Sequence, residues 1–452
     1  MDRRRIGTLQ EKEEKRFVAE NPKSNAMFKR AKKSLLAGVP MNWMVRWAGP
    51  FPVFVASAKG AHIEDVDGHQ YIDFCLGDTG AMFGHSPKDV ADAVKGRIDS
   101  GITTMLPTED SIWVGEALAE RFGLPYWQFV MTATDANRFS IRLAREVTGR
   151  SKILVFNGCY HGSVDEALIW IRDGKALPGP GNTGPAIDPA MTTRVVEFND
   201  IPALEEALSH DDVACVLCEP AMTNIGIVLP QEGYHEALRE ITRRHGTLLI
   251  FDETHTICTG PGGYTREHQL TPDMITIGKP IAGGIPAAAY GISEEVAARV
   301  QAKVAETMKT NASDSGVGGT LSGNALAVTA MKANLEKVMT EEAYERMTAM
   351  AKRLERGINE VIRSRDLPWH VIRLGARVEY EFQPEPLRNG SEGQEVEDYE
   401  LDRLMHLMAL NRGILLTPFH YMALVSPETN EGDVDRYSEV FAECVDLLIG
   451  DG

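Results

Sequence analysis

Short apolar segments recur between residues 100 and 325, and segments with the periodicity of a helix separate several of them. Continuous apolar strands that alternate with helices are typical of a mainly parallel sheet covered by helices on both faces. The sequence therefore predicts a large α/β domain over residues 86–325. The predicted strands are 127–131, 152–156, 213–217, 247–251 and 274–277, and the predicted helices are 135–148, 202–209 and 232–245.

The flanking segments have a different pattern. Residues 1–36 are polar, charged and helical in period, which fits either an arm on a partner subunit or a solvated surface helix. Alternating polarity on both sides of Asp67-Gly68 predicts a β-hairpin. Towards the C-terminus we expect helices at 323–338, at 341–364 and from Glu431, with a strand at 376–382. We assign residues 1–85 to an N-terminal arm and small-domain segment, and residues 326–452 to a C-terminal α+β domain.

Two shorter stretches also carry local signals. Ser86-Pro87 predicts a helix start, since Ser suits the cap and Pro the first turn. Residues 175–189 are rich in Gly and Pro, so we expect a surface loop there, at the rim of a site.

Composition excludes several classes of function. The 452 residues carry 47 Lys and Arg against 65 Asp and Glu, a formal net charge of −18, and no basic stripe. This argues against nucleic-acid binding, because such binding depends on neutralising phosphates. No segment reaches the roughly 18 apolar residues needed to span a bilayer, and no apolar region typical of a secretory signal follows the charged N-terminus. Six scattered cysteines fit a reducing compartment, so we expect a cytoplasmic protein.

Asp252 and Lys279 are the leading candidates for chemistry. Asp252 ends the apolar segment TLLIFD, and Lys279 follows the next predicted strand in DMITIGK. The carboxyl ends of parallel strands meet at one edge of a sheet, where ligands usually bind. Taken alone, the pair is compatible with a simple salt bridge. Whether it is a catalytic pair therefore depends on the surrounding residues.

Those surroundings supply candidates for each requirement of pyridoxal phosphate chemistry. The cofactor needs a lysine amine, a carboxylate for its ring nitrogen, an aromatic side chain over the ring and donors for its phosphate. Residues 132–134 place hydroxyls and amides at a predicted helix N-terminus, where the helix dipole favours an anion. Tyr160 follows a strand within GCYHG, and Thr320 ends a Gly-Gly-Thr segment. The order of these features along the chain is more specific than any one of them.

The sequence resembles the class III aminotransferases of pyridoxal phosphate fold type I. The resemblance is carried by GCYHG, by LLIFDE, PDMITIGK and GGIPAAAYG, and by GGTLSGNALA. It is strongest towards the branch of glutamate-1-semialdehyde aminomutase-like proteins and β-amino-acid transaminases. It implies a large α/β domain with a mainly parallel sheet, a smaller α+β domain made from both chain ends, and pyridoxal 5′-phosphate as cofactor. It also implies a homodimer with active sites shared between the subunits.

The resemblance assigns roles to individual residues. Lys279 would be the Schiff-base lysine, Asp252 the partner of the ring nitrogen, and Tyr160 the residue stacked on the ring. Thr320 would reach the phosphate from the neighbouring subunit, and Glu219 matches the Glu-Pro of the family. The phosphate would be lined by Thr132, Ala133 and Thr134.

This sequence departs from the family pattern at four places. Ala133 stands where a Gly is usual, and Ala is less permissive where backbone approaches a phosphate. Thr254 replaces Val in the usual Asp-Glu-Val. His255 stands where relatives carry Gln or Met, and either bonds the ring hydroxyl or is a packed histidine. A C-terminal arginine that β-amino-acid transaminases use for a carboxylate falls at Pro418-Phe419, beside His420, so we do not expect that clamp here.

Candidates for substrate contacts lie ahead of the hairpin. Arg suits a planar carboxylate through paired N–H donors. Arg46 either contacts substrate or is a structural ion-pair partner, and Trp47 with Trp43 and Phe83 either forms an aromatic pocket or belongs to the core. We expect Arg377 to be structural.

Cys215 and Cys218 match a C-x-x-C spacing, but they lie inside one apolar strand. Residues three apart on a strand face opposite sides, and no second cysteine pair or metal-spaced histidines accompany them. We predict packing for this pair and no metal site.

These features predict an aminotransferase that moves an amino group from an amine or amino acid donor to an oxo-acid acceptor by a ping-pong mechanism. Lys279 would act as base and acid, and Asp252 would keep the ring nitrogen cationic. The alternatives are a 2,1-aminomutase, which needs no external acceptor, and a pyridoxal phosphate lyase. A non-catalytic member of the family is the alternative from another class.

Overall fold

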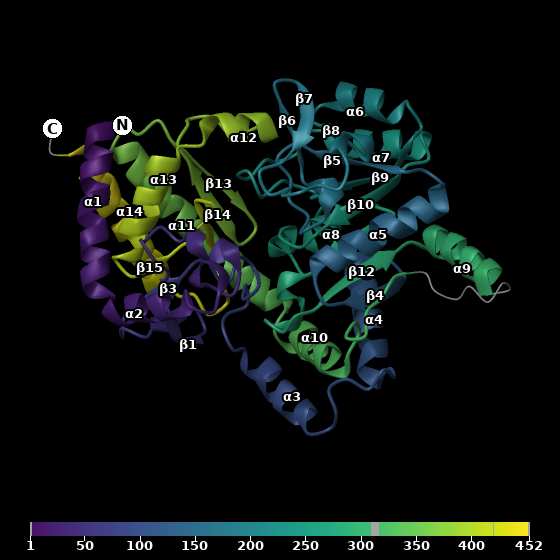
Figure 1. The fold of residues 1–452 in the computed structure, drawn as a ribbon, viewed down its shortest axis with the longest axis horizontal. Helices are drawn as coiled ribbons and strands as arrows, with labels where there is room; N and C mark the ends of the chain where they lie inside the picture. The colour runs from purple at the N-terminus through teal and green to yellow at the C-terminus, as the bar shows by residue number, and fades with distance from the viewer. Residues whose placement is uncertain (1, 309–315, 419, 451–452) are drawn as a thin grey trace. The chain divides into compact units, whose positions relative to one another are not determined.

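The computed structural model describes residues 2–308, 316–418 and 420–450 (Figure 1). Within these residues the chain forms two compact units. Unit 1 comprises Met1–Pro87, Glu345–Pro386 and Val396–Gly452, and unit 2 comprises Lys88–Tyr344 and Leu387–Glu395. The first boundary lies close to the predicted one, but the second lies after residue 344 rather than 325. The difference arises because α10 (Ala325–Lys337) packs against α3 (Lys88–Ile98) and α4 (Glu109–Phe122) of unit 2.

Unit 2 is built on a sheet with the strand order β4-β12-β11-β10-β9-β5-β8. Strand β12 runs antiparallel to both of its neighbours, and the pairs from β11 to β8 are parallel. This mainly parallel sheet confirms the predicted α/β fold class. The bounds are β4 (Tyr126–Val130), β5 (Lys152–Phe156), β8 (Thr193–Val196), β9 (Val213–Cys218), β10 (Leu248–Asp252), β11 (Met274–Ile277) and β12 (Ala288–Ile292).

Helices cover both faces of this sheet. On one face, α5 (Ala133–Thr148) packs against β9, β11 and β12, and its apolar side chains join a core that also includes Val296 of α9 (Glu294–Met308) (Figure 1). On the other face, α6 (Ile201–Leu208) and α7 (Tyr234–Arg244) pack against β8 and β10. There Phe156, Phe198 and Tyr234 form a cluster of contacting aromatic rings. The remaining helices are the short α8 (Gly263–Glu267) and α12 (Gly390–Val396).

Two parts of unit 2 differ from the sequence-based expectation. Strands β8 and β12 were not predicted, and β12 has the sequence AAYGI, which lacks the β-branched run of its neighbour β11. The expected loop at 175–189 begins instead with β7 (Lys175–Pro178), which forms a hairpin with β6 (Ile169–Arg172).

Unit 1 joins the two ends of the chain in its sheets. The predicted hairpin is present as β2 (His62–Asp65) and β3 (Gln70–Asp73), and Gly68 takes the φ of 98° that its turn requires. Strand β3 pairs in parallel with β15 (Ile414–Leu415), which comes from the C-terminal part of the chain. The other strands are β1 (Val55–Lys59), β13 (His370–Leu374), β14 (Arg377–Glu381) and β16 (Met422–Leu424).

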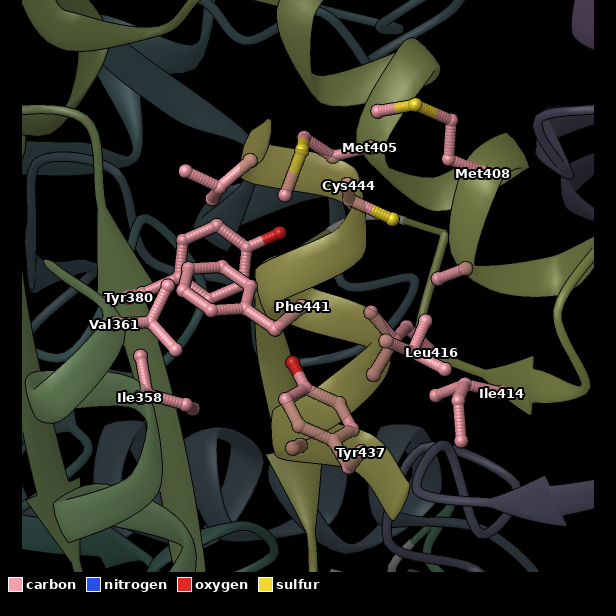
Figure 2. Packing of buried hydrophobic residues seen from close by; sticks show 14 of the residues in the cluster. Ile358, Val361, Tyr380, Met405, Met408, Ile414, Leu416, Tyr437, Phe441 and Cys444 are labelled. Atoms are coloured by element: carbon pink, nitrogen blue, oxygen red, sulfur yellow. The ribbon is translucent and has the colours of Figure 1, made fainter. Parts of the chain in front are cut away.

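Among its described residues, unit 1 contains two apolar clusters, and Figure 2 shows part of the larger one. Tyr380 of β14 packs there with Phe441, their ring centroids 4.9 Å apart. The N-terminal helix α1 (Arg3–Glu20) packs against α13 (Tyr399–Leu410) and buries Phe17, so the segment predicted as an arm or a solvated helix is anchored in its own unit. The other helices are α2 (Pro22–Ala31), α11 (Glu341–Ser364) and α14 (Glu431–Ile449).

No helix among the described residues is both long enough and apolar enough to cross a membrane.

Candidate active site

The carboxyl edge of the sheet in unit 2 carries both leading candidates. Asp252 is the last residue of β10 and lies opposite Thr276 of β11, and the backbone N–H of Glu253 donates to the carbonyl oxygen of Thr276 at 2.8 Å. Lys279 follows Thr276 by three residues, at the start of the 3₁₀ turn η6 (Lys279–Ala282). Two adjacent parallel strands therefore deliver the carboxylate and the amine to the same edge, as the sequence predicted.

Three donors hold the carboxylate of Asp252. His161 Nδ1 and Asn137 Nδ2 both lie 2.9 Å from Oδ2, and the backbone N–H of Thr254 donates to Oδ1 at 3.0 Å. Asn137 is itself held, because its Oδ1 accepts from the hydroxyl of Thr276 at 2.6 Å. Asp252 is only 4% exposed, so these contacts fix its orientation within the protein interior.

The same contacts keep Asp252 charged. Burial alone would raise its pKa, but the hydrogen bonds and the charge of His161, with the bonds from Thr254 and Asn137, outweigh burial and lower the pKa to about 2. For His161, burial opposes protonation, whereas Cys159 and Asp252 favour it and hold its pKa well above the ordinary value. The two side chains form a buried ion pair, and the negative charge of Asp252 is available to a cationic ring nitrogen.

Lys279 has a strained backbone. Its φ is +38°, which places a non-glycine residue in the left-handed region, and Pro280 follows it. The strained turn is held by Asn334, whose Nδ2 donates to the carbonyl oxygens of Pro280 at 2.8 Å and Ile281 at 3.1 Å. The Nζ of Lys279 lies 2.7 Å from Nε2 of His255. Strain of this kind is concentrated at functional positions.

The N-terminus of α5 has the donors that could hold an anion. Thr132 caps the helix by accepting from the N–H of Asp135 at 3.1 Å, which leaves the other amides of the first turn at the helix end. The Oγ1 of Thr134 accepts from the N–H of Ser163 at 3.1 Å. Gly162, with φ of +80°, packs against Thr134 so closely that a Cβ there would clash with Oγ1.

The structure accommodates the departure at Ala133. A Cβ built at Gly278 would lie 2.8 Å from the Cβ of Ala133, so the methyl group of Ala133 occupies the space that Gly278 leaves open. The Ala therefore fits at the helix start, with glycine on the neighbouring turn.

The other residues assigned by resemblance differ in exposure and in hydrogen bonding. They are Tyr160, Glu219 and Thr320. Tyr160 is 47% exposed, and its stacking on the cofactor ring stays a prediction. The carboxylate of Glu219 accepts from the side chains of Thr223 and Asn224, and burial raises its pKa. The carboxylate of Glu219 is therefore already hydrogen-bonded to residues of its own loop. Thr320 is exposed in a turn, and its role towards a neighbouring subunit stays a prediction.

The candidates for substrate contact belong to unit 1. Arg46 is exposed at the end of the turn η2 (Asn42–Arg46), and Trp47 packs at the edge of an apolar cluster around Phe17. Their contact with substrate stays a prediction. Arg377 is fully buried and donates from Nη2 to the hydroxyl of Thr79 at 2.9 Å, which agrees with a structural role. Phe419, beside the place of the family's C-terminal arginine, lies outside the described residues.

Sequence reasoning did not assign two residues of this site. His161 belongs to the GCYHG segment that was used only for Tyr160, and Asn137 lies on the buried face of α5. A polar residue on the apolar face of an amphipathic helix was the available signal for Asn137.

The donors present fit pyridoxal phosphate. The α5 N-terminus with Thr134 suits a phosphate, ionised Asp252 suits a protonated ring nitrogen, and Lys279 supplies a primary amine. No cluster of three or more potential metal ligands occurs among the described residues. Cys215 and Cys218 are both buried in β9, and burial raises the pKa of both thiols.

Comparison with known proteins identifies the family. The family model described as aminotransferase class-III matches residues 43–432. The chain belongs to this family. A class-III relative, the glutamate-1-semialdehyde 2,1-aminomutase of Sulfurihydrogenibium azorense, is 34% identical over 94% of this chain and 99% of that protein.

Similar solved structures support this family assignment. A glutamate-1-semialdehyde aminomutase from Pseudomonas aeruginosa PAO1 is 48% identical, with a TM-score of 0.96 over 99% of both chains, and a lysine-to-alanine variant of it was solved in complex with PMP. An omega-transaminase from Sphaerobacter thermophilus is 29% identical, with a TM-score of 0.86 over 94% of this chain and 98% of that one. The fold is the pyridoxal phosphate fold type I, and the cofactor of this class-III enzyme is pyridoxal 5′-phosphate.

Proposed function

We propose that this enzyme is a glutamate-1-semialdehyde 2,1-aminomutase or an isomerase of the same type, which moves an amino group between neighbouring carbons of one molecule. The observation that carries the proposal is the 48% identity to the Pseudomonas aeruginosa aminomutase over 99% of both chains. Glutamate-1-semialdehyde 2,1-aminomutases of other organisms add support at 32–35% identity. The comparisons thus favour the isomerase that the sequence alone placed second to a transaminase.

Different residues of unit 2 would carry the separate steps of this reaction. When bound, pyridoxal phosphate takes up the amino nitrogen and stabilises the electron pair left when a proton leaves the substrate carbon. Asp252, kept ionised by His161, would hold the proton on the ring nitrogen. The amides of α5 and the hydroxyl of Thr134 would hold the phosphate. Lys279 would accept the proton at Nζ and return it to a different carbon.

A reaction without an amino acceptor tests the proposal. Purified enzyme is incubated with glutamate-1-semialdehyde alone, and the isomer with exchanged amino and oxo groups, 5-amino-4-oxopentanoate, is measured by chromatography. The proposal expects product from the wild type and none from Lys279→Ala. A wild-type enzyme that forms no product under these conditions would contradict glutamate-1-semialdehyde as its substrate.

A transaminase is the second candidate, favoured by Thr254, by His255 and by the Trp-containing segment 41–47. It would move the amino group from a donor amine to an oxo acid. Amine plus pyruvate then yields alanine, whereas glutamate-1-semialdehyde alone gives nothing. In that case Arg46→Ala should raise KM for carboxylated donors but not for simple amines. Phosphate release from a phosphorylated amine would instead indicate a lyase.

A cytoplasmic homodimer is part of the proposal. All six cysteines are buried and none forms a disulfide, which fits a reducing compartment. Unit 2 also exposes apolar side chains over a short stretch of chain, which suits a surface covered by a second copy. These are Ile98, Ile102, Met105, Leu106 and Ile112. Light scattering on the purified enzyme would test the dimer.

A further inference from the structure

We infer that His255 is the base that removes a proton from the side-chain ammonium of Lys279 and so prepares the amine to bond to the cofactor. The inference rests on the proposed function, because it takes Lys279 as the lysine that binds pyridoxal phosphate. The observation that carries it is the distance of 2.7 Å between Nζ of Lys279 and Nε2 of His255. At this distance an imidazole nitrogen accepts a hydrogen bond from an ammonium group.

The backbone of His255 is held by contacts that do not involve Lys279. The neighbouring Glu253 anchors the loop from both sides, because its carboxylate accepts from the N–H groups of Tyr264 at 3.1 Å and Thr265 at 2.6 Å and from the hydroxyl of Thr256. His255 itself begins the turn η5 (Thr256–Thr259) as its cap and is 5% exposed. The imidazole is therefore a fixed group of the interior.

Lys279 is fixed independently. Asn334 anchors the turn that follows it, and the strained φ of Lys279 is maintained by that turn. Two independently anchored residues meet at hydrogen-bond distance, so the contact is set by the fold and does not depend on a chance orientation of two mobile side chains.

A base next to the lysine would speed the bonding of its amine to the cofactor. A lysine side chain in water is an ammonium at neutral pH and has no lone pair for attack on a carbonyl carbon, whereas histidine is largely neutral there. In the proposed step one N–H bond of the Lys279 ammonium breaks and an N–H bond forms at Nε2 of His255. Lys279 becomes a neutral amine and His255 a cation. One positive charge is moved and none is created, so burial imposes no penalty for an additional charge.

The inferred role differs from a contact with the ring hydroxyl, the role considered from the sequence. A glutamine at position 255 would retain a hydrogen-bonding group for that oxygen but would not accept a proton. His255→Gln therefore separates the two roles. His255→Ala leaves space in which added imidazole can act as a substitute base.

The test measures how fast the full-length chain, stripped of cofactor, takes up pyridoxal phosphate, followed by the absorbance of the bound cofactor. We expect uptake to be about 10²-fold slower in His255→Gln and His255→Ala, the usual scale of general base catalysis. Added imidazole should restore part of the rate in His255→Ala. The matched control is His235→Gln, another buried histidine of unit 2, which should take up cofactor at the wild-type rate.

A wild-type rate in His255→Gln would overturn the inference, as would equal slowing in His235→Gln or an absence of rescue in folded His255→Ala. After uptake, each variant is reduced with borohydride and its peptides are mapped. A label on a residue other than Lys279 would contradict the site in the proposed function. A label on Lys279 with unchanged rates in the variants would remove only the role of His255.

Discussion

The Nδ1 atom of His161 lies 2.9 Å from Oδ2 of Asp252, and neither side chain is more than 5% exposed. The two residues are 91 positions apart in the sequence, and the pair forms only when the loop after β5 meets the end of β10. Its consequence is a carboxylate that stays ionised in the interior, with a pKa of about 2.

Replacing Asp252 by Asn should weaken cofactor binding and slow turnover by about 10²-fold each. The amide keeps much of the shape of the carboxylate but loses the charge, and a charge-assisted hydrogen bond is worth about 1.5–3 kcal/mol. Fluorescence titration with pyridoxal phosphate measures the first effect and steady-state kinetics the second. Asp273→Asn is the matched control, because Asp273 is a buried acid paired with Arg239 at 2.7 Å and should affect stability alone. Wild-type cofactor affinity in Asp252→Asn would refute the assignment.

The strained φ of +38° at Lys279 predicts a difference between two inactive variants. Lys279→Ala and Lys279→Gly both lack the amine, so neither should be labelled by cofactor and borohydride. Glycine adopts positive φ without strain, whereas alanine does not. Lys279→Gly should therefore be more stable than Lys279→Ala by about 1 kcal/mol. Urea denaturation measures this difference, and equal stabilities would show that the turn stores no strain.

The positions of Asp252 and Lys279 could be predicted because each depends on one local pattern. An apolar strand followed by a polar residue indicates the carboxyl end of a parallel strand, and β10 and β11 follow this pattern within a residue of the expected bounds. The cap at Thr132 is equally local, since the hydroxyl and the amide of Asp135 are three residues apart.

Local sequence patterns could not predict which residues contact these side chains. Asn137 reaches Asp252 across 115 positions, and its role depends on how α5 lies on the sheet. Similarly, α10 was assigned to the C-terminal domain because the pattern of long helices begins with it, whereas its packing against α3 and α4 places it in unit 2. Tertiary packing, which the sequence does not display, decides both cases.

Gly162→Ala should disrupt the phosphate cradle. The added methyl group would clash with Oγ1 of Thr134, and φ of +80° is unfavourable for alanine. Gly149→Ala is a matched control, because its φ of +69° imposes similar backbone strain but its Cβ would meet open space. Both variants should lose about 1–2 kcal/mol of stability, but only Gly162→Ala should also bind pyridoxal phosphate about tenfold more weakly. Calorimetry of cofactor binding measures this. Equal affinities in the two variants would show that the close contact with Thr134 is not needed.

A buried histidine away from this site predicts a specific pH dependence of stability. His235 on α7 is 9% exposed, and its ring packs edge-on against Phe251. Burial lowers the pKa of His235 to about 4. Below the ordinary value of about 6.5, the unfolded chain binds a proton at this residue and the folded protein does not. Stability is therefore present above pH 6.5 and is lost as the pH falls towards 4.

The loss of stability at low pH should disappear when the imidazole of His235 is removed. His235→Phe replaces imidazole by an apolar ring among aromatic neighbours. Between pH 8 and pH 4, the free energy of unfolding of this variant should therefore fall less than that of the wild type. The difference should be about 3 kcal/mol for a pKa shift of this size. Urea denaturation at pH 8, 6 and 4 measures both profiles. His210→Phe, at an exposed position, should keep the wild-type slope. Parallel profiles for wild type and His235→Phe would mean that burial does not lower the pKa of His235, because a group with equal proton affinity in both states contributes no slope.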